Sequence, residues 1–123
     1  MPGLTAAATR LREWHAQLAP PGVLIVGLVL IAARPGRIPA PVRRYCDILA
    51  PLVAGAVYSI GWHESLVALE KRELAPCDLA APLPPLRKRL ALTDAAPRDA
   101  HKAAAQITES IAGLQETGVL QQL

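Results

Sequence analysis

The sequence contains no phenylalanine, and its aromatic residues are limited to two tryptophans and two tyrosines. Aromatic side chains usually supply much of the apolar area that a small core buries. Any core of this chain must therefore be built mainly from smaller aliphatic residues, although 52% of the 123 residues are hydrophobic. This composition argues against a compact soluble core that is sufficient by itself.

Motifs for catalysis and for metal binding are also missing. The sequence has no glycine-rich phosphate loop, no HExxH motif and no nucleophile elbow. Its three histidines come from separate segments, and two cysteines are too few for a disulfide framework. We therefore predict no enzyme activity, no metal site and no cofactor. Cys46 and Cys77 are interpreted as unrelated thiols, with a single bridge open as the alternative in an oxidising compartment.

The net charge of +3 is too small to indicate a nucleic-acid partner, and we expect none. The basic run at residues 87–89 has no interleaved aromatic residues and is interpreted as solvated charge. The segment from residue 34 to residue 44 carries four arginines and no acid: Arg34, Arg37, Arg43 and Arg44. Such a segment fits a topology determinant beside a membrane, or a site for anionic headgroups such as those of cardiolipin. Asp47 is expected to pair with Arg43 or Arg44, one helical turn away.

Two uncharged stretches, residues 20–33 and 48–62, decide the predicted fold. A helix over residues 22–33 would measure about 18 Å, which is short for a bilayer. The second stretch, from Tyr45 to Trp62, would measure about 26 Å and has an aromatic residue at each end. The first stretch is rich in β-branched residues and fits a buried strand as well, but no second strand-like run is evident to pair with it.

The predicted fold class is therefore an all-α membrane protein with a short helical hairpin, made of one full span and one marginal span. An N-terminal amphipathic helix would occupy residues 1–19, and the membrane hairpin with a helical stalk residues 20–74. A proline-rich basic arm would follow at residues 75–92, and a C-terminal amphipathic docking helix, capped near Asp94 and stopped near Gly118, at residues 93–123.

Two sets of residues are candidates for contacts between helices. Small residues recur at four-residue steps in the second apolar stretch and predict a helix-packing face: Ala50, Ala54, Gly55, Ser59 and Gly61. Apolar residues on one stripe of the last helix predict docking onto another protein: Ile107, Ile111 and Leu114. The alternative for this stripe is packing against the stalk of the same chain.

In its size, its proline-rich arm and its lack of catalytic residues, the predicted hairpin resembles in general style the accessory subunits of large respiratory assemblies. The resemblance implies a non-catalytic structural subunit of a respiratory-chain or ATP synthase complex in the mitochondrial inner membrane, or of a complex in a bacterial inner membrane. Its expected partners are other subunits and membrane lipids, with cardiolipin as a candidate. A pore-forming protein such as a holin and a soluble helical adaptor are the alternatives.

Overall fold

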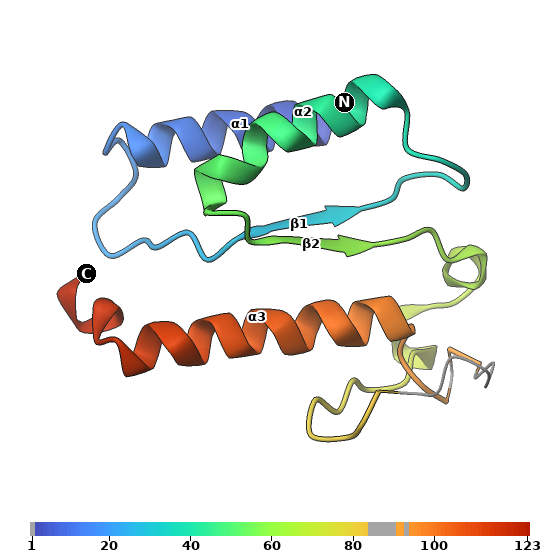
Figure 1. Ribbon diagram of the computed structural model, residues 1–123. Helices are drawn as coiled ribbons and strands as arrows, with labels where there is room; N and C mark the ends of the chain where they lie inside the picture. The colour runs from blue at the N-terminus through green and yellow to red at the C-terminus, as the bar shows by residue number, and fades with distance from the viewer. Residues whose placement is uncertain (1, 84–90, 93) are drawn as a thin grey trace.

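The computed structural model describes residues 2–83, 91, 92 and 94–123, which form three layers. In Figure 1, helices α1 (Pro2–His15) and α2 (Ala40–Leu49) lie on one side of a small sheet. Helix α3 (Arg98–Glu116) lies on the other side. The order of the layers is therefore helices, sheet, helix.

The sheet consists of two parallel strands, β1 (Leu28–Ile31) and β2 (Val57–Ile60). Leu28 pairs with Val57, and the register continues to the end of both strands. Parallel neighbours cannot be joined by a tight hairpin, so the chain returns to the start of β2 by way of α2. The unit β1–α2–β2 is thus the centre of the fold, and α3 packs against β2.

The main core lies between the sheet and the first helical layer. Four buried residues form it, and they come from α1, from the end of α2 and from the turn that follows: Ala8, Leu11, Leu49 and Val53. Leu28 of β1 and Val57 of β2 pack against this cluster. On the opposite face of the sheet, Tyr58 and Ala103 are buried where β2 meets α3.

The predicted all-α membrane hairpin is wrong. No helix in the described ranges combines the length and the apolar character that a membrane span requires. The predicted helix at residues 22–33 is instead extended chain that contains β1. Valine and isoleucine at five of these positions favour extended backbone, and β2 supplies the partner strand that the sequence did not reveal.

The predicted span from Tyr45 to Trp62 is divided into three pieces. Helix α2 ends at Leu49, a 3₁₀ turn follows at Ala50–Val53, and the chain then becomes β2. Ala54 and Gly55 have φ angles of 51° and 78°, which a right-handed helix cannot contain. Since these two residues have left-handed backbone conformations, no continuous right-handed helix forms across the segment.

The remaining predicted elements have mixed outcomes. The stalk helix is wrong, because the segment after β2 contains only two short 3₁₀ turns, Glu64–Val67 and Lys71–Glu73. The N-terminal and C-terminal helices are confirmed as α1 and α3. The predicted cap near Asp94 is wrong, because α3 begins after its N-cap Pro97. The predicted stop is confirmed, because Gly118, with a φ of 73°, follows the end of the helix. The basic run at residues 87–89 lies outside the described residues.

Candidate functional site

Asp99, in the first turn of α3, joins this helix to the end of β2. Its Oδ2 accepts a hydrogen bond of 2.7 Å from the backbone N–H of Gly61, and its Oδ1 lies 2.7 Å from Nε2 of His63. The N–H of Ala100 also donates to Oδ1, at 2.8 Å. A carboxylate is favoured in this position because the N-terminus of a helix carries partial positive charge. The cluster of Asp99, Gly61 and His63 therefore fixes where α3 begins against the sheet.

The surroundings of Asp99 lower the pKa of its carboxyl group. Partial burial by itself would raise this pKa, but the N–H of Gly61 and the contact with His63 outweigh that effect. A general base that works near neutral pH needs the opposite shift. We therefore interpret the carboxylate of Asp99 as a structural anchor.

A groove of about 580 Å³ lies between β2 and the first half of α3, beside this cluster. Ser59, Lys102 and Gln106 contribute polar atoms to its lining. The hydroxyl of Tyr58, which also lines the groove, lies 2.7 Å from the hydroxyl of Ser110. Since His63 contacts Asp99 and no described hydroxyl or thiol bonds to it, we assign no catalytic step to this groove. The expectation that the chain is not an enzyme stays a prediction.

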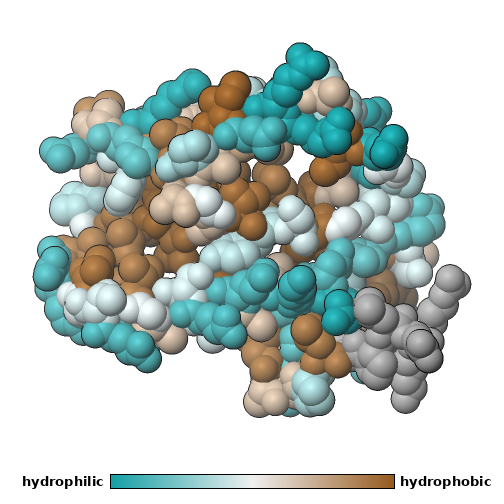
Figure 2. Space-filling model, in the orientation of Figure 1, coloured by the Kyte–Doolittle hydropathy of each residue, from teal (hydrophilic) through white to brown (hydrophobic). Residues whose placement is uncertain are grey.

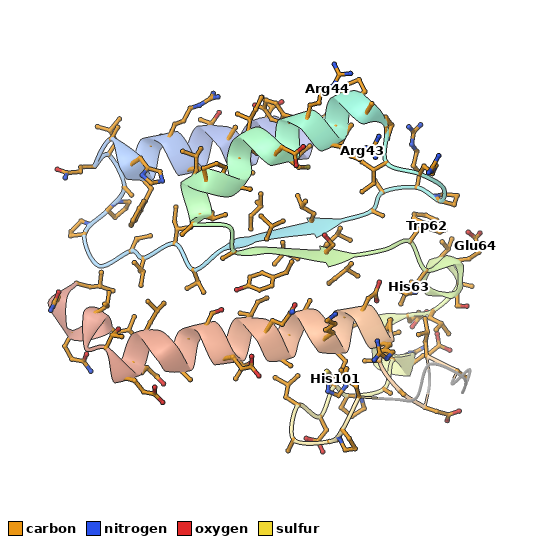
Figure 3. The ribbon with its side chains drawn as sticks, in the orientation of Figure 1. Arg43, Arg44, Trp62, His63, Glu64 and His101 are labelled. Atoms are coloured by element: carbon orange, nitrogen blue, oxygen red, sulfur yellow. The ribbon has the colours of Figure 1, made fainter. Side chains whose placement is uncertain are left out.

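A second groove, of about 390 Å³, lies where β1 meets the start of α2, and we call it the arginine-rimmed groove. Four residues give it an apolar lining: Leu30, Ile38, Ala40 and Cys46. Arg43, Arg44 and Asp47 supply its charged groups. In Figure 3, Arg43 and Arg44 extend from α2 at the end of the molecule where Trp62, His63 and Glu64 lie. The groove thus combines an apolar surface with two guanidinium groups.

The lining of this groove keeps a net positive charge, because it has two arginines and one carboxylate, Asp47, and no ion pair joins them. Helix α2 has no acidic residue in its first turn and no side-chain cap, so its partial positive charge adds to that of the arginines. None of the four arginines between residues 34 and 44 takes part in an ion pair with another described residue. The predicted pairing of Asp47 with Arg43 or Arg44 is therefore wrong.

Cys46 contributes apolar surface to the groove. Burial, followed by the negative charge of Asp47, raises the pKa of the Cys46 thiol. A thiol with a raised pKa holds less of the reactive thiolate at neutral pH. Both cysteines are free thiols, as the interpretation of two unrelated thiols predicts.

The five residues of the predicted helix-packing face do not share one helix. Ala50 lies on the 3₁₀ turn after α2, and Ala54 and Gly55 form the left-handed turn that follows. Ser59 belongs to β2, and Gly61 comes just after this strand. Because the single helix that would align them does not form, the structure offers no common face for these residues.

The predicted docking residues lie together on α3. Ile111 is 38% exposed, whereas Ile107 and Leu114 are half-buried. Packing against a helical stalk is wrong, because that segment forms only 3₁₀ turns. Docking of the stripe onto another protein stays a prediction.

Sequence reasoning missed the contact between Asp99 and His63. An acidic residue two positions after Pro97 indicates the first turn of a helix. No local pattern indicates a partner 36 residues away, because that contact depends on the packing of α3 beside β2. Asp47 and the four arginines were recognised, but their apolar neighbours Leu30 and Ile38 were not.

No family model matches the chain, and no curated protein or solved structure matches it either. Its function must therefore be argued from the geometry of its own residues.

Proposed function

We propose that this chain is a non-catalytic subunit of a larger protein assembly and binds an acidic, amphipathic segment of a partner protein. The observation that carries the proposal is the arginine-rimmed groove, in which an apolar lining lies beside two arginines that form no ion pair with a described residue. An amphipathic segment with carboxylates on its polar side offers both complements.

The apolar part of the groove is suited to receive aliphatic side chains. Ile38 is 51% exposed and lies with Leu30 in the lining. Covering such surface contributes roughly 25 cal/mol for each Å² that is removed from water. The partner segment would therefore place its own apolar side chains against these two residues.

The charged part of the groove accounts for the sign of the partner. Guanidinium groups bind carboxylates through paired hydrogen bonds, so Arg43 and Arg44 fit glutamate or aspartate side chains. Positive side chains beside a helix N-terminus each cost about 0.3–1 kcal/mol. Carboxylates of a partner would remove this repulsion at the start of α2, so binding and local stability favour the same acidic partner.

The surface as a whole supports a subunit role. Among the described residues, Leu18, Ile31 and Val67 are each at least 69% exposed. Figure 2 shows hydrophobic residues on the visible face between the upper helical layer and α3, at the level of the sheet. Exposed apolar side chains in this number are consistent with a chain that binds partners.

The proposal can be tested by purifying the tagged full chain from its native cells and identifying the proteins that accompany it. The test variant is Arg43→Glu/Arg44→Glu. The matched control is Arg12→Glu/Lys71→Glu, which makes the same change in net charge at exposed positions far from the groove along the chain. We expect the test variant to lose its partner and the control to retain it. High salt should weaken the wild-type complex, because exposed charges are screened.

Two results would contradict the proposal. Equal recovery of the partner with both variants would show that the groove is not the docking site. Flotation of the purified chain with cardiolipin-containing vesicles, without any protein partner and with dependence on Arg43 and Arg44, would favour the headgroup prediction instead.

A further inference from the structure

The two outer edges of the sheet differ in how many of their backbone groups are already bonded. Leu28 donates its N–H to the carbonyl of Ala56, and Ala32 donates to the carbonyl of Ile60. With the parallel register, the backbone groups of alternate β1 residues face β2, and those of Val29 and Ile31 face outward. By the same alternation, the outward groups at the β2 edge belong to Val57, Ser59 and Gly61.

The edge of β2 is partly closed, because two of its three outward N–H groups are bonded. The N–H of Val57 donates to the carbonyl of Gly55 at 2.9 Å, and the N–H of Gly61 donates to Asp99 at 2.7 Å. Charged residues, Lys102 among them, line the groove that runs along this strand. Bonded backbone groups and nearby charges are the means by which proteins protect a strand from pairing with another chain.

The edge of β1 has no such protection. No backbone hydrogen bond links Val29 or Ile31 to any described segment outside the sheet. Residues 22–33 contain neither a charged residue nor a proline. Val29 lies on the face of the sheet where its neighbour Tyr58 contacts α3, yet Val29 and Ile31 are 41% and 69% exposed. Both the backbone edge and the side chains of β1 are therefore open on this face.

We propose that a second copy of this chain pairs with the open edge of β1, so that two β1 strands join antiparallel about a twofold axis. The result is a continuous four-stranded sheet in the order β2–β1–β1–β2. This inference goes beyond the proposed function, because it concerns the backbone edge of β1 and another partner. Leu30 belongs to both sites, but the pairing does not require the arginines of the groove.

The second copy is the favoured occupant because the edge is complementary to itself. A pairing strand must be extended, apolar and without proline, and β1 meets each requirement. Since residues 22–33 are uncharged, the two copies bring no like charges together along the pairing. An acidic segment, by contrast, would find no positive charge within the strand.

The same asymmetry explains why the pairing would stop at two chains. Each chain has one open edge, and an interface between identical edges uses both of them. The outer edges of the four-stranded sheet would then be the two β2 edges, at which two of the three outward N–H groups are already bonded. A two-stranded sheet is marginal in water by itself, whereas three or more strands with a covered face are stable.

The exposed side chains also define the register. In an antiparallel pair, residues whose backbone groups point toward the partner strand lie opposite one another. Val29 can therefore lie opposite Ile31 of the second copy. This register places Leu30 on the twofold axis. The contact between Val29 and Ile31 then occurs twice, once on each side of the axis. Shifting the pairing by two residues in one direction would place Ile31 opposite Gly27, which has no side chain to contact it. A shift in the other direction would place Val29 opposite the smaller Ala33.

The test is sedimentation equilibrium of the purified full chain over a wide concentration range. The first variant is Ile31→Lys, and Val67→Lys is its matched control, since both side chains are 69% exposed. The second variant, Val29→Pro, removes an outward N–H without adding charge and leaves the bonds to β2 in place. Circular dichroism of each variant verifies that it is folded.

We expect a reversible dimer for the wild type and for Val67→Lys. Ile31→Lys and Val29→Pro should each raise the dimer dissociation constant roughly tenfold or more. Arg43→Glu/Arg44→Glu should leave the dimer intact, which separates this inference from the proposed function. A wild type that stays monomeric, a dimer insensitive to both β1 variants, or an open series of larger oligomers would each overturn the inference.

Discussion

Asp99 is a single side chain that joins two elements distant in sequence. Its carboxylate accepts hydrogen bonds from Gly61 and contacts His63, so it fixes the first turn of α3 beside the end of β2. The side chains of Asp99 and His63 are 36% and 27% exposed, which means that solvent screens part of their attraction.

Replacing this carboxylate tests its structural role. We expect Asp99→Asn to lower the free energy of unfolding by about 1 kcal/mol, after allowance for solvent screening. Glu109→Gln, which removes an exposed carboxylate on the same helix, should change it by less than about 0.5 kcal/mol. Urea denaturation measures both variants, and equal effects would show that Asp99 has no special role.

The lowered pKa of Asp99 also predicts a dependence on pH. A carboxyl group whose pKa is lower in the folded chain contributes stability above its unfolded pKa, which is about 4. That contribution disappears as the pH falls through the folded value. The difference in free energy of unfolding between the wild type and Asp99→Asn should therefore shrink below about pH 4. Urea titrations at several acidic pH values would contradict this if the difference stayed constant.

Gly27 illustrates a close approach between two backbones. A Cβ atom at this position would lie 2.7 Å from both the carbonyl oxygen of Ala56 and a ring carbon of Tyr58. Gly27→Ala should therefore destabilise the fold by about 1–3 kcal/mol. Gly113→Ala in α3, where nothing lies within 4 Å, should instead stabilise it by about 0.5–1 kcal/mol. Thermal unfolding of the two variants would show shifts of opposite sign, and shifts of equal sign would contradict this packing.

At the scale of elements, the decisive feature is the end of α2. The apolar stretch continues past Leu49, but the left-handed backbone of Ala54 and Gly55 turns the chain from helix into strand. Hydropathy does not distinguish an apolar helix from an apolar strand, and the small residues that suggested helix packing are compatible with a turn. The predicted span therefore contains the end of a helix, a 3₁₀ turn and a strand, and it is not one continuous helix.

Two alanine-to-glycine substitutions separate these readings of the segment. Ala54 has a positive φ that strains an L-residue, so Ala54→Gly should stabilise the fold by about 0.5 kcal/mol. Ala50 has right-handed helical angles, so Ala50→Gly should destabilise it by about 1 kcal/mol. Chemical denaturation would give opposite signs for the two variants, whereas a continuous helix from Tyr45 to Trp62 would give destabilisation in both.

At the scale of the whole molecule, the core is small for the number of apolar residues in the chain. Over half of the sequence is hydrophobic, yet six apolar residues are buried within the described ranges. Folding of the isolated chain therefore gains little from burial, and its free energy of unfolding should be at or below the low end of the range for natural domains, about 5 kcal/mol. Partners that cover β1 or the arginine-rimmed groove would add to this margin.

A dimer joined through β1 predicts that thermal stability depends on concentration. Because a second copy binds only the folded chain, the midpoint of thermal unfolding of the wild type should rise as protein concentration increases. Ile31→Lys should remove most of this dependence, while Val67→Lys should keep it. Differential scanning calorimetry at several concentrations provides the measurement, and a constant midpoint for the wild type would falsify the expectation.

Local sequence patterns were sufficient to predict the features that depend on neighbouring residues. Apolar periodicity predicted the two terminal helices. The freedom of glycine to adopt a positive φ predicted that the last helix ends near Gly118. Composition showed the positive charge of the segment from residue 34 to residue 44. The absence of phenylalanine indicated a core with little aromatic area, and Tyr58 is the one aromatic residue that the described chain buries.

Features that depend on contacts between distant segments could not be predicted from local patterns and are set by the packing of the folded chain. The pairing of β1 with β2 joins residues 29 positions apart, and its hydrogen bonds are what make extended backbone favourable for both apolar stretches. The same pairing leaves β1 open at one edge, and α3 then brings Asp99 to Gly61 and His63 at the other. Hydropathy reports how strongly a segment avoids water, whereas the partner that shields it is fixed by the packing of the whole chain.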